Sequence, residues 1–217
     1  MSDLTHWAHR PRPHGEPIEG RYARLEKLGS AHAATLYEAS SMAESYRWLF
    51  DHPPASREAF DEWLSTASVP ADPLFYSVID LATGRAEGRQ ALMRITPDHG
   101  VIEIGSILWG PRISRTRVAT EALYLFAEHA FDKLGYRRFE WKCDAENAPS
   151  RRAALRFGFT FEGIFRQHMV VKHKNRDTAW FAITDGEWPQ LKARYQRWLD
   201  ASNFDESGKQ RRRLEEC

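Results

Sequence analysis

The stretch that decides the fold is Val101–Lys133, VIEIGSILWGPRISRTRVATEALYLFAEHAFDK. Its first part, Val101–Trp109, is a short apolar run rich in β-branched residues, which predicts a buried strand. The Gly-Pro pair that follows ends this strand. Apolar residues then recur at spacings of three and four, which predicts a long helix that begins near Thr116. The stretch therefore predicts a strand, a loop and a helix.

The loop of this stretch is basic, with Arg112, Arg115 and Arg117 close to the start of the helix. A helix N-terminus carries unpaired N–H groups and a partial positive charge. Together with three guanidinium groups it is expected to form a binding site for a phosphate or pyrophosphate. The alternative is a solvated basic turn.

Composition narrows the class of protein. The 217 residues include 31 basic and 30 acidic side chains, a net charge of +1, which argues against broad nucleic-acid binding. There is no apolar run of the ~20 residues that span a bilayer, so no membrane partner is expected. The N-terminus lacks the apolar centre of a signal peptide, and only two cysteines are present. A cytoplasmic protein is therefore predicted.

Histidine and tryptophan usage gives two further expectations. The nine histidines show no metal-ligand spacing, so no metal is predicted. Most of the eight tryptophans should lie in the core or in a pocket wall. Tryptophan-rich surfaces could also support a homodimer, although the sequence identifies no such surface.

The remaining elements follow from apolar periodicity and turn residues. Residues 1–16 are expected to form an irregular arm, residues 17–200 a single domain, and residues 201–217 a polar, disordered tail. The predicted strands are Ile18–Leu25, Phe75–Leu81, Gln90–Thr96, Val101–Trp109, Arg137–Cys143, Phe159–Phe165, His168–Lys172 and Thr178–Thr184. The predicted helices are Ala31–Ser41, Ser56–Ala67, the long helix from Thr116, Ser150–Phe157 and Glu187–Leu199.

This order predicts an α/β (α+β) fold with a mixed central sheet flanked by helices. Three strands joined by short loops, ending with Val101–Trp109, form an antiparallel meander. The strand Arg137–Cys143 follows the long helix, so it should lie parallel to Val101–Trp109 through a right-handed crossover. Residues Lys174–Asp177 are expected to form a polar hairpin loop.

Two motifs carry a family resemblance. The segment ATEAL with an EIG strand before it resembles the RimJ/RimL-like branch of the GNAT acetyltransferases. The family's phosphate-loop pattern has a glycine where this chain has Arg117. Asn147 and Ser150, followed by Gly-Phe, are similar to the family's second acyl-CoA motif. The resemblance covers about residues 17–188, and it implies the GNAT fold, in which two parallel strands splay apart.

The resemblance implies an N-acetyltransferase that moves an acetyl group from acetyl-CoA directly to a primary amine. The acceptor is a small molecule or a protein N-terminus. Asn147 and Ser150 have an alternative role as caps of the following helix. The residues expected to bind acetyl-CoA are Ile107, Leu108, Ser114, Arg115, Thr116, Arg117, Val118, Ala119, Thr120, Asn147 and Ser150.

Catalysis needs a base for the ammonium group of the acceptor. Glu103 aligns with the glutamate of the EIG strand, and burial in an apolar strand would raise its pKa toward a useful range. His168, Asp144 and water are the alternatives, and a salt-bridged structural glutamate is the alternative role for Glu103. The tyrosine with which some GNAT enzymes protonate the departing thiolate is replaced by Ala154, so Ser150 or water would fill that role.

The acceptor pocket is expected between the first two helices and the terminal hairpin. Its predicted wall includes Trp48, Phe50, Phe165 and Trp180, each of which could instead be ordinary packing. Arg176 of the hairpin is expected to form a turn-stabilising ion pair with Asp177. A competing function is a non-catalytic acyl-CoA-binding protein on the same fold, which the missing glycine and tyrosine favour.

Overall fold

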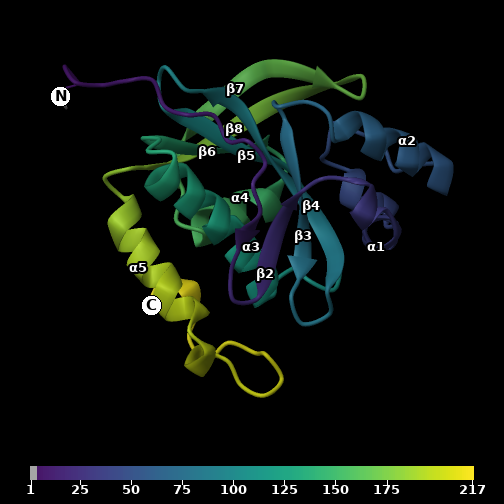
Figure 1. The fold of residues 1–217 in the computed structure, drawn as a ribbon. Coiled ribbons are helices and arrows are strands. Elements are labelled where there is room, and N and C mark those ends of the chain that lie inside the picture. Colours follow the sequence, from purple (N-terminus) through teal and green to yellow (C-terminus); the bar gives the residue numbers. More distant parts are fainter. Residues whose placement is uncertain (1–3) are drawn as a thin grey trace.

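The computed structural model describes residues 4–217 (Figure 1). The first three residues of the predicted arm lie outside the described residues, and no helix or strand forms between residues 4 and 17. The strands are β1 (Ile18–Glu19), β2 (Ala23–Lys27), β3 (Leu74–Asp80), β4 (Arg85–Thr96), β5 (Val101–Trp109), β6 (Arg138–Asp144), β7 (Thr160–Val171) and β8 (Lys174–Thr184). The helices are α1 (Ala33–Ala39), α2 (Arg57–Ala67), α3 (Arg117–Glu128), α4 (Ala148–Arg156) and α5 (Trp188–Leu199).

The strands form one sheet in the order β1-β2-β3-β4-β5-β6-β8-β7. Only β5 and β6 pair in parallel, and every other neighbouring pair is antiparallel. The predicted mixed α/β sheet is therefore confirmed. Within the described residues, no helix combines the length and apolar character that crossing a membrane requires.

The two faces of the N-terminal half of the sheet carry separate cores, because successive strand residues point to opposite faces. Tyr76 and Val78 of β3 belong to the main core, where the Tyr76 ring meets Phe126 of α3. Phe75 and Ile79 belong to a smaller core under α1 and α2. The helices α1 and α2 therefore lie on the opposite face from α3 (Figure 1).

The prediction of one strand over Ile18–Leu25 is wrong, because a turn divides this segment into β1 and β2. The two strands pair antiparallel, with Ile18 opposite Leu25. The carboxylate of Glu121 on α3 accepts hydrogen bonds from the amides of Arg21, Tyr22 and Ala23. A partner one hundred residues away thus fixes a turn that the local pattern does not contain.

The C-terminal hairpin also differs from its prediction. The two short strands expected over residues 159–172 are one long strand, β7, and Lys174–Asp177 is the start of β8. The turn consists of Lys172 and His173, whose φ values are 49° and 63°. Two consecutive residues with positive φ make a tight hairpin connection. The polar residues after it therefore pair with β7 as part of β8 and do not form a loop.

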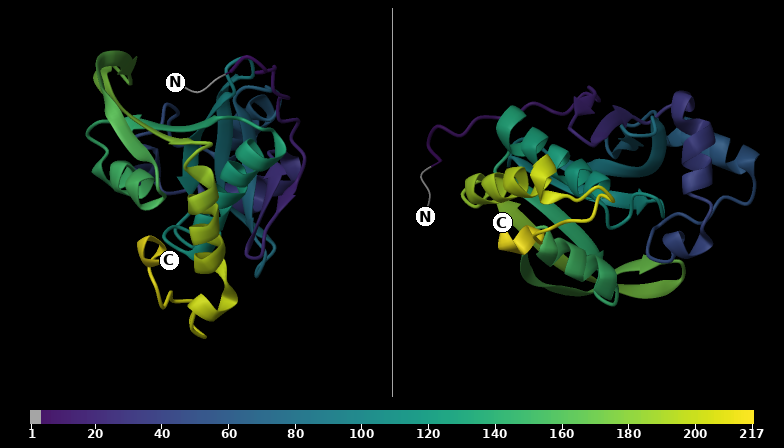
Figure 2. Two further views of the ribbon diagram at one scale, coloured as in Figure 1. Left: turned by 90° about the vertical axis from the view of Figure 1, so that its left-hand side faces the viewer. Right: turned by 90° about the horizontal axis from the view of Figure 1, so that it is seen from below.

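The tail after α5 is packed, so the prediction of a disordered tail is wrong. Phe204 and Leu214 are buried, and the Trp198 indole donates to the Gln210 side chain at 2.9 Å. The Phe204 ring contacts Trp198 at a centroid distance of 5.1 Å. Figure 2 shows the tail, in yellow, returning to α5. The tail is mostly polar and its few apolar residues show no regular spacing, so the sequence pattern does not predict that they are buried.

Removing this anchor should destabilise the protein. Phe204→Ala is expected to lower the free energy of unfolding by about 3 kcal/mol, because it deletes a buried aromatic ring. Urea unfolding would measure the change, with the exposed tail variant Glu206→Ala as the control. If Phe204→Ala lowers the free energy of unfolding no more than Glu206→Ala does, the tail has no stabilising role.

Candidate active site

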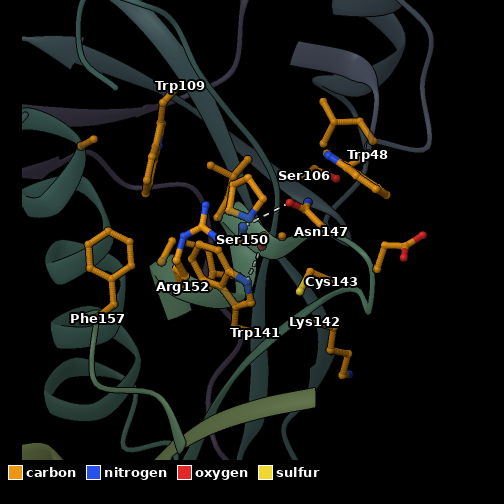
Figure 3. Close-up of a pocket in the computed structure, with 18 of the residues that line it drawn as sticks. Trp48, Ser106, Trp109, Trp141, Lys142, Cys143, Asn147, Ser150, Arg152 and Phe157 are labelled. Atoms are coloured by element: carbon orange, nitrogen blue, oxygen red, sulfur yellow. Dashed lines mark hydrogen bonds between the residues drawn. The ribbon is translucent and has the colours of Figure 1, made fainter. Parts of the chain in front are cut away.

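A cavity of about 710 Å³ opens where β5 and β6 separate (Figure 3). The two strands pair from Val101 and Arg138 as far as Ile104 and Trp141, and no further. Beyond this point, residues 105–109 and 142–144 line the two sides of the gap, apart from Leu108. The gap exposes strand backbone that has no β6 partner, which is the arrangement that an extended ligand can complete.

Both strands contribute to the separation. Ser106 of β5 has a φ of 49°, and the pairing with β4 shifts register between its neighbours, as expected for a bulge. The buried Arg89 donates to the Ser106 carbonyl oxygen at 3.3 Å and so holds this bulge. On the other side, β6 stays paired with β8 as far as Asp144 and Thr178, and therefore diverges from β5.

One end of the cavity is the loop before α3. Thr116 caps the helix and accepts from the Val118 amide at 3.2 Å. Among the described residues, no acceptor pairs with the amides of Arg115, Arg117 and Ala119. Ser114, Arg115, Ala119 and Thr120 line the cavity. Unpaired amides at the N-terminus of a twelve-residue helix are donors that could bind an anion.

The arginine in place of the family's glycine does not obstruct this loop. The Arg117 guanidinium turns away and lies over the Tyr22 ring, 4.3 Å from its centroid, and near Phe204. The left-handed position of the loop is Arg115, with a φ of 64°. Of the predicted acetyl-CoA residues, Leu108, Thr116, Arg117 and Val118 do not line the cavity.

Two further arginines, on α4, line the same end and are absent from the sequence prediction. Arg152 and Arg156 lie four residues apart, which places them on one face of the helix. Arg156 donates to the Thr120 hydroxyl at 3.3 Å, and burial lowers the pKa of its guanidinium. An i, i+4 arginine pair just after Asn147 was the signal that could have identified them.

Asn147 and Ser150 lie in the middle of the cavity and are held in place by local hydrogen bonds (Figure 3). The Asn147 side chain caps α4 by accepting from the Ser150 amide at 3.1 Å. The Ser150 hydroxyl accepts from the Trp141 indole at 3.0 Å. The capping role is therefore real, and the Ser150 hydroxyl proton remains available to a ligand.

Glu103 lies at the vertex of the gap, with 2% of its surface exposed. Its carboxylate pairs with the Arg94 guanidinium at 2.7 Å and the Lys142 ammonium at 2.8 Å. Arg94 reaches it from a bulge of β4, where its φ is 48° and Asp72 accepts from its amide. Glu103 is thus both salt-bridged and part of the cavity wall.

The protonation of Glu103 reflects two opposed effects. Burial raises the pKa of this carboxyl above its ordinary value, while Lys142 and Arg94 offset part of the rise. Glu140, opposite Glu103 on β6, shares Lys142 at 2.6 Å but does not line the cavity. The two carboxylates therefore share one ion-pair network, and only Glu103 of the two reaches the cavity.

The far end of the cavity lies under the segment between α1 and α2. Trp48 and Phe50 line it, as predicted for an acceptor pocket, and Figure 3 shows Trp48 opposite the end formed by Trp109 and Phe157. Three other predicted residues are not part of this wall. Phe165 contacts Trp180 in a tilted arrangement with a centroid distance of 4.5 Å, and His168 contacts the same ring from an exposed position. His168 donates to or accepts from the Thr178 hydroxyl at 2.9 Å.

In residues 4–217, no group of three or more histidine, cysteine or acidic side chains could hold a metal ion. The polar groups that line the cavity include backbone amides, arginines, a serine hydroxyl and a buried carboxylate. These groups suit the binding of an extended anionic ligand and a proton transfer near the vertex of the gap.

Known proteins share both the sequence and the fold. A sequence profile of the family described as acetyltransferase (GNAT) domain matches residues 23–160. A crystal structure of a GCN5-related N-acetyltransferase from Brucella melitensis is 58% identical, with 98% of each chain covered and a TM-score of 0.96. A search of curated proteins gave no significant match.

Two other structures are more distant. A probable acetyltransferase (GNAT family) from Chromobacterium violaceum is 38% identical over 87% of this chain and 96% of its own, with a TM-score of 0.81. An acetyl transferase from Salmonella typhimurium that modifies the N-terminal serine of ribosomal protein L7/L12 is 19% identical over 78% and 99%, with a TM-score of 0.68. This last similarity concerns the fold alone.

Proposed function

This chain belongs to the GNAT acetyltransferases, and on that basis we propose that it transfers an acetyl group from acetyl-CoA directly to a primary amine. The observation that carries the proposal is the cavity between β5 and β6. It joins an anion site at the start of α3 to a buried carboxylate at the vertex of the gap, and it continues to an aromatic pocket.

The donor would occupy the end formed by α3 and α4. The free amides of Arg115, Arg117 and Ala119 would hold its pyrophosphate, with Arg152 and Arg156 as further cationic partners. Its pantetheine arm would pair with the unpartnered edge of residues 105–109, including Ile107. The thioester would then lie near the vertex of the gap.

Two side chains would assist the transfer: Glu103 as the base and Ser150 as a hydrogen-bond donor. Glu103 would accept a proton from the ammonium group of the acceptor, because only the neutral amine attacks a thioester. The neutral form of an alkyl amine is scarce near pH 7, since its unperturbed pKa is about 10. Ser150 would stabilise the departing thiolate by donating a hydrogen bond to it, while its oxygen keeps the hydrogen bond from Trp141.

Donor binding should be visible as thermal stabilisation. Acetyl-CoA at 100 times its dissociation constant contributes about 2.7 kcal/mol, which raises the midpoint of a protein this size by roughly 5–10 °C. Arg152→Ala should weaken binding about tenfold, because one charge-assisted contact is lost. Arg152 is exposed, so this variant should unfold at the wild-type temperature without ligand.

Two results would redirect the proposal. No rise with millimolar acetyl-CoA would contradict donor binding. A normal rise in the unfolding midpoint, but no release of the CoA thiol from acetyl-CoA with any amine of a broad panel, would favour the alternative. That alternative is a non-catalytic acyl-CoA-binding protein. That alternative is supported by Ala154, which replaces the protonating tyrosine of some relatives.

The finer features stay predictions. They are the RimJ/RimL-like branch, the choice between a small-molecule amine and a protein N-terminus, a homodimer, and a cytoplasmic location. Mass spectrometry of amines and peptides incubated with acetyl-CoA would separate the two acceptor classes.

A further inference from the structure

Arg176 of β8 is a buried cation that forms no ion pair in the described residues, although the charge of nearby Asp144 acts on it. Only 7% of its surface is exposed, and its side chain lines the cavity. Among residues 4–217, no carboxylate forms an ion pair with it, and its guanidinium donates no hydrogen bond. Its Nε is fully buried without a partner. A buried charge is costly unless a partner compensates for it, so this arrangement needs an explanation.

The ion pair that the sequence predicts between Arg176 and Asp177 does not form. Asp177 accepts from the Gln167 amide at 2.7 Å and from the Asn175 side chain at 2.9 Å. Neighbouring strand residues point to opposite faces, so Asp177 faces away from the cavity and Arg176 faces into it. The Arg176 guanidinium therefore does not stabilise the turn and remains available to a ligand in the cavity.

Arg176 belongs to the acceptor end of the cavity. Its guanidinium carbon lies 5.0 Å from the centroid of the Phe50 ring, which comes from the segment between α1 and α2. Lys172 of the same hairpin donates to the Tyr46 carbonyl oxygen at 2.8 Å and ties the two segments together. The phosphates of the donor have their own arginines at the other end, Arg115, Arg152 and Arg156.

The charges of this end define the missing partner. Arg94, Lys142 and Arg176 line it together with Glu103 and Asp144, and Lys142 also pairs with Glu140 at 2.6 Å. Glu103 already holds Arg94 and Lys142. Burial also lowers the pKa of the Arg176 guanidinium. Arg94 and Lys142 thus have carboxylate partners, whereas Arg176 has no ion pair in the described residues. A planar guanidinium matches a carboxylate through two parallel hydrogen bonds.

We propose that Arg176 binds a carboxylate of the acceptor, so that the substrate is an amine that also bears a carboxylate, such as an amino acid. This proposal rests on the proposed acetyl transfer and specifies its substrate class. Arg176 would hold the carboxylate under Phe50 while the amine points toward Glu103.

The test uses product analogues, so that it does not depend on turnover. N-acetylglycine, N-acetylleucine and N-acetylphenylalanine would be titrated by calorimetry into the protein saturated with CoA, each beside its primary amide. At least one acid should bind wild type about tenfold more tightly than its amide, because the guanidinium hydrogen-bonds a charged group. Arg176→Gln should remove this preference, and Arg176→Lys should retain part of it.

A matched control and separate readouts distinguish the outcomes. Arg166→Gln changes an exposed arginine of the same hairpin that does not line this cavity, and it should leave the preference unchanged. Equal binding of acids and amides, binding of neither, or an acid preference that survives Arg176→Gln would overturn the assignment. Acetyl-CoA affinity would be measured on the same samples. If acetyl-CoA binds normally, such a failure concerns Arg176 alone; if it does not bind, the proposed function fails.

Discussion

Replacement of Glu103 by glutamine is expected to lower the turnover number about 100- to 1,000-fold, within the range that general-base catalysis contributes. The amide cannot accept a proton from the acceptor, yet it preserves the shape of the side chain. Acetyl-CoA affinity should stay nearly unchanged, because the proposed donor site lies at the start of α3, away from Glu103. Steady-state kinetics with saturating acetyl-CoA would measure the effect.

Glu140→Gln is the matched control. Glu140 is also buried, pairs with the same Lys142 and lies opposite Glu103 in the sheet, but it does not line the cavity. An equal loss of turnover in both variants would mean that the ion-pair network matters, rather than proton transfer by Glu103.

The pH profile provides a second readout for the same variant. Only the ionised carboxylate accepts a proton, so kcat/KM of wild type should fall as the pH drops through the pKa of Glu103. Burial raises that pKa, so the fall should begin above the usual range of a glutamate. Glu103→Gln should lose this acidic limb, and a limb that persists would assign it to another group.

The second large effect concerns Asp51, the partner of the buried Arg89. Arg89 is 2% exposed, and its only ion-pair partner among the described residues is Asp51. Asp51→Asn should lower the free energy of unfolding by about 3 kcal/mol, because it leaves an uncompensated buried charge. The midpoint of thermal unfolding should drop by roughly 6–12 °C.

Asp61→Asn is the corresponding surface change. Asp61 pairs with Arg57 on α2, and the two side chains are 48% and 39% exposed. Loss of this surface ion pair should lower the free energy of unfolding by less than about 0.5 kcal/mol. Similar costs for the two variants would contradict a structural role for the Arg89–Asp51 pair. Because Arg89 also holds the Ser106 bulge, Asp51→Asn should further weaken acetyl-CoA binding.

Features with a local cause could be predicted from the sequence. Ser56 and Thr116 cap the helices that they precede, and Val101–Trp109 is a strand with the predicted bounds. The parallel pair and its separation followed from element order and family resemblance. Asn147 and Ser150 lie in the cavity as expected, since their positions depend on the start of α4.

Features that depend on distant partners could not be predicted. The turn between β1 and β2 exists because Glu121 binds its amides, and Arg117 leaves the phosphate loop because Tyr22 and Phe204 offer it aromatic faces. The isolation of Arg176 likewise depends on which face of β8 the neighbouring Asp177 occupies. Sequence spacing suggested an ion pair there, but strand geometry separates the two side chains.

The packed tail has a consequence for biosynthesis. Gln210, which follows α5 by eleven residues, lines the cavity and accepts the Trp198 hydrogen bond. A chain is made from its N-terminus, so the sheet can form while these residues are still awaiting translation. The cavity therefore lacks part of its wall until residue 210 has been made, and a premature stop codon after α5 would give a protein without this part.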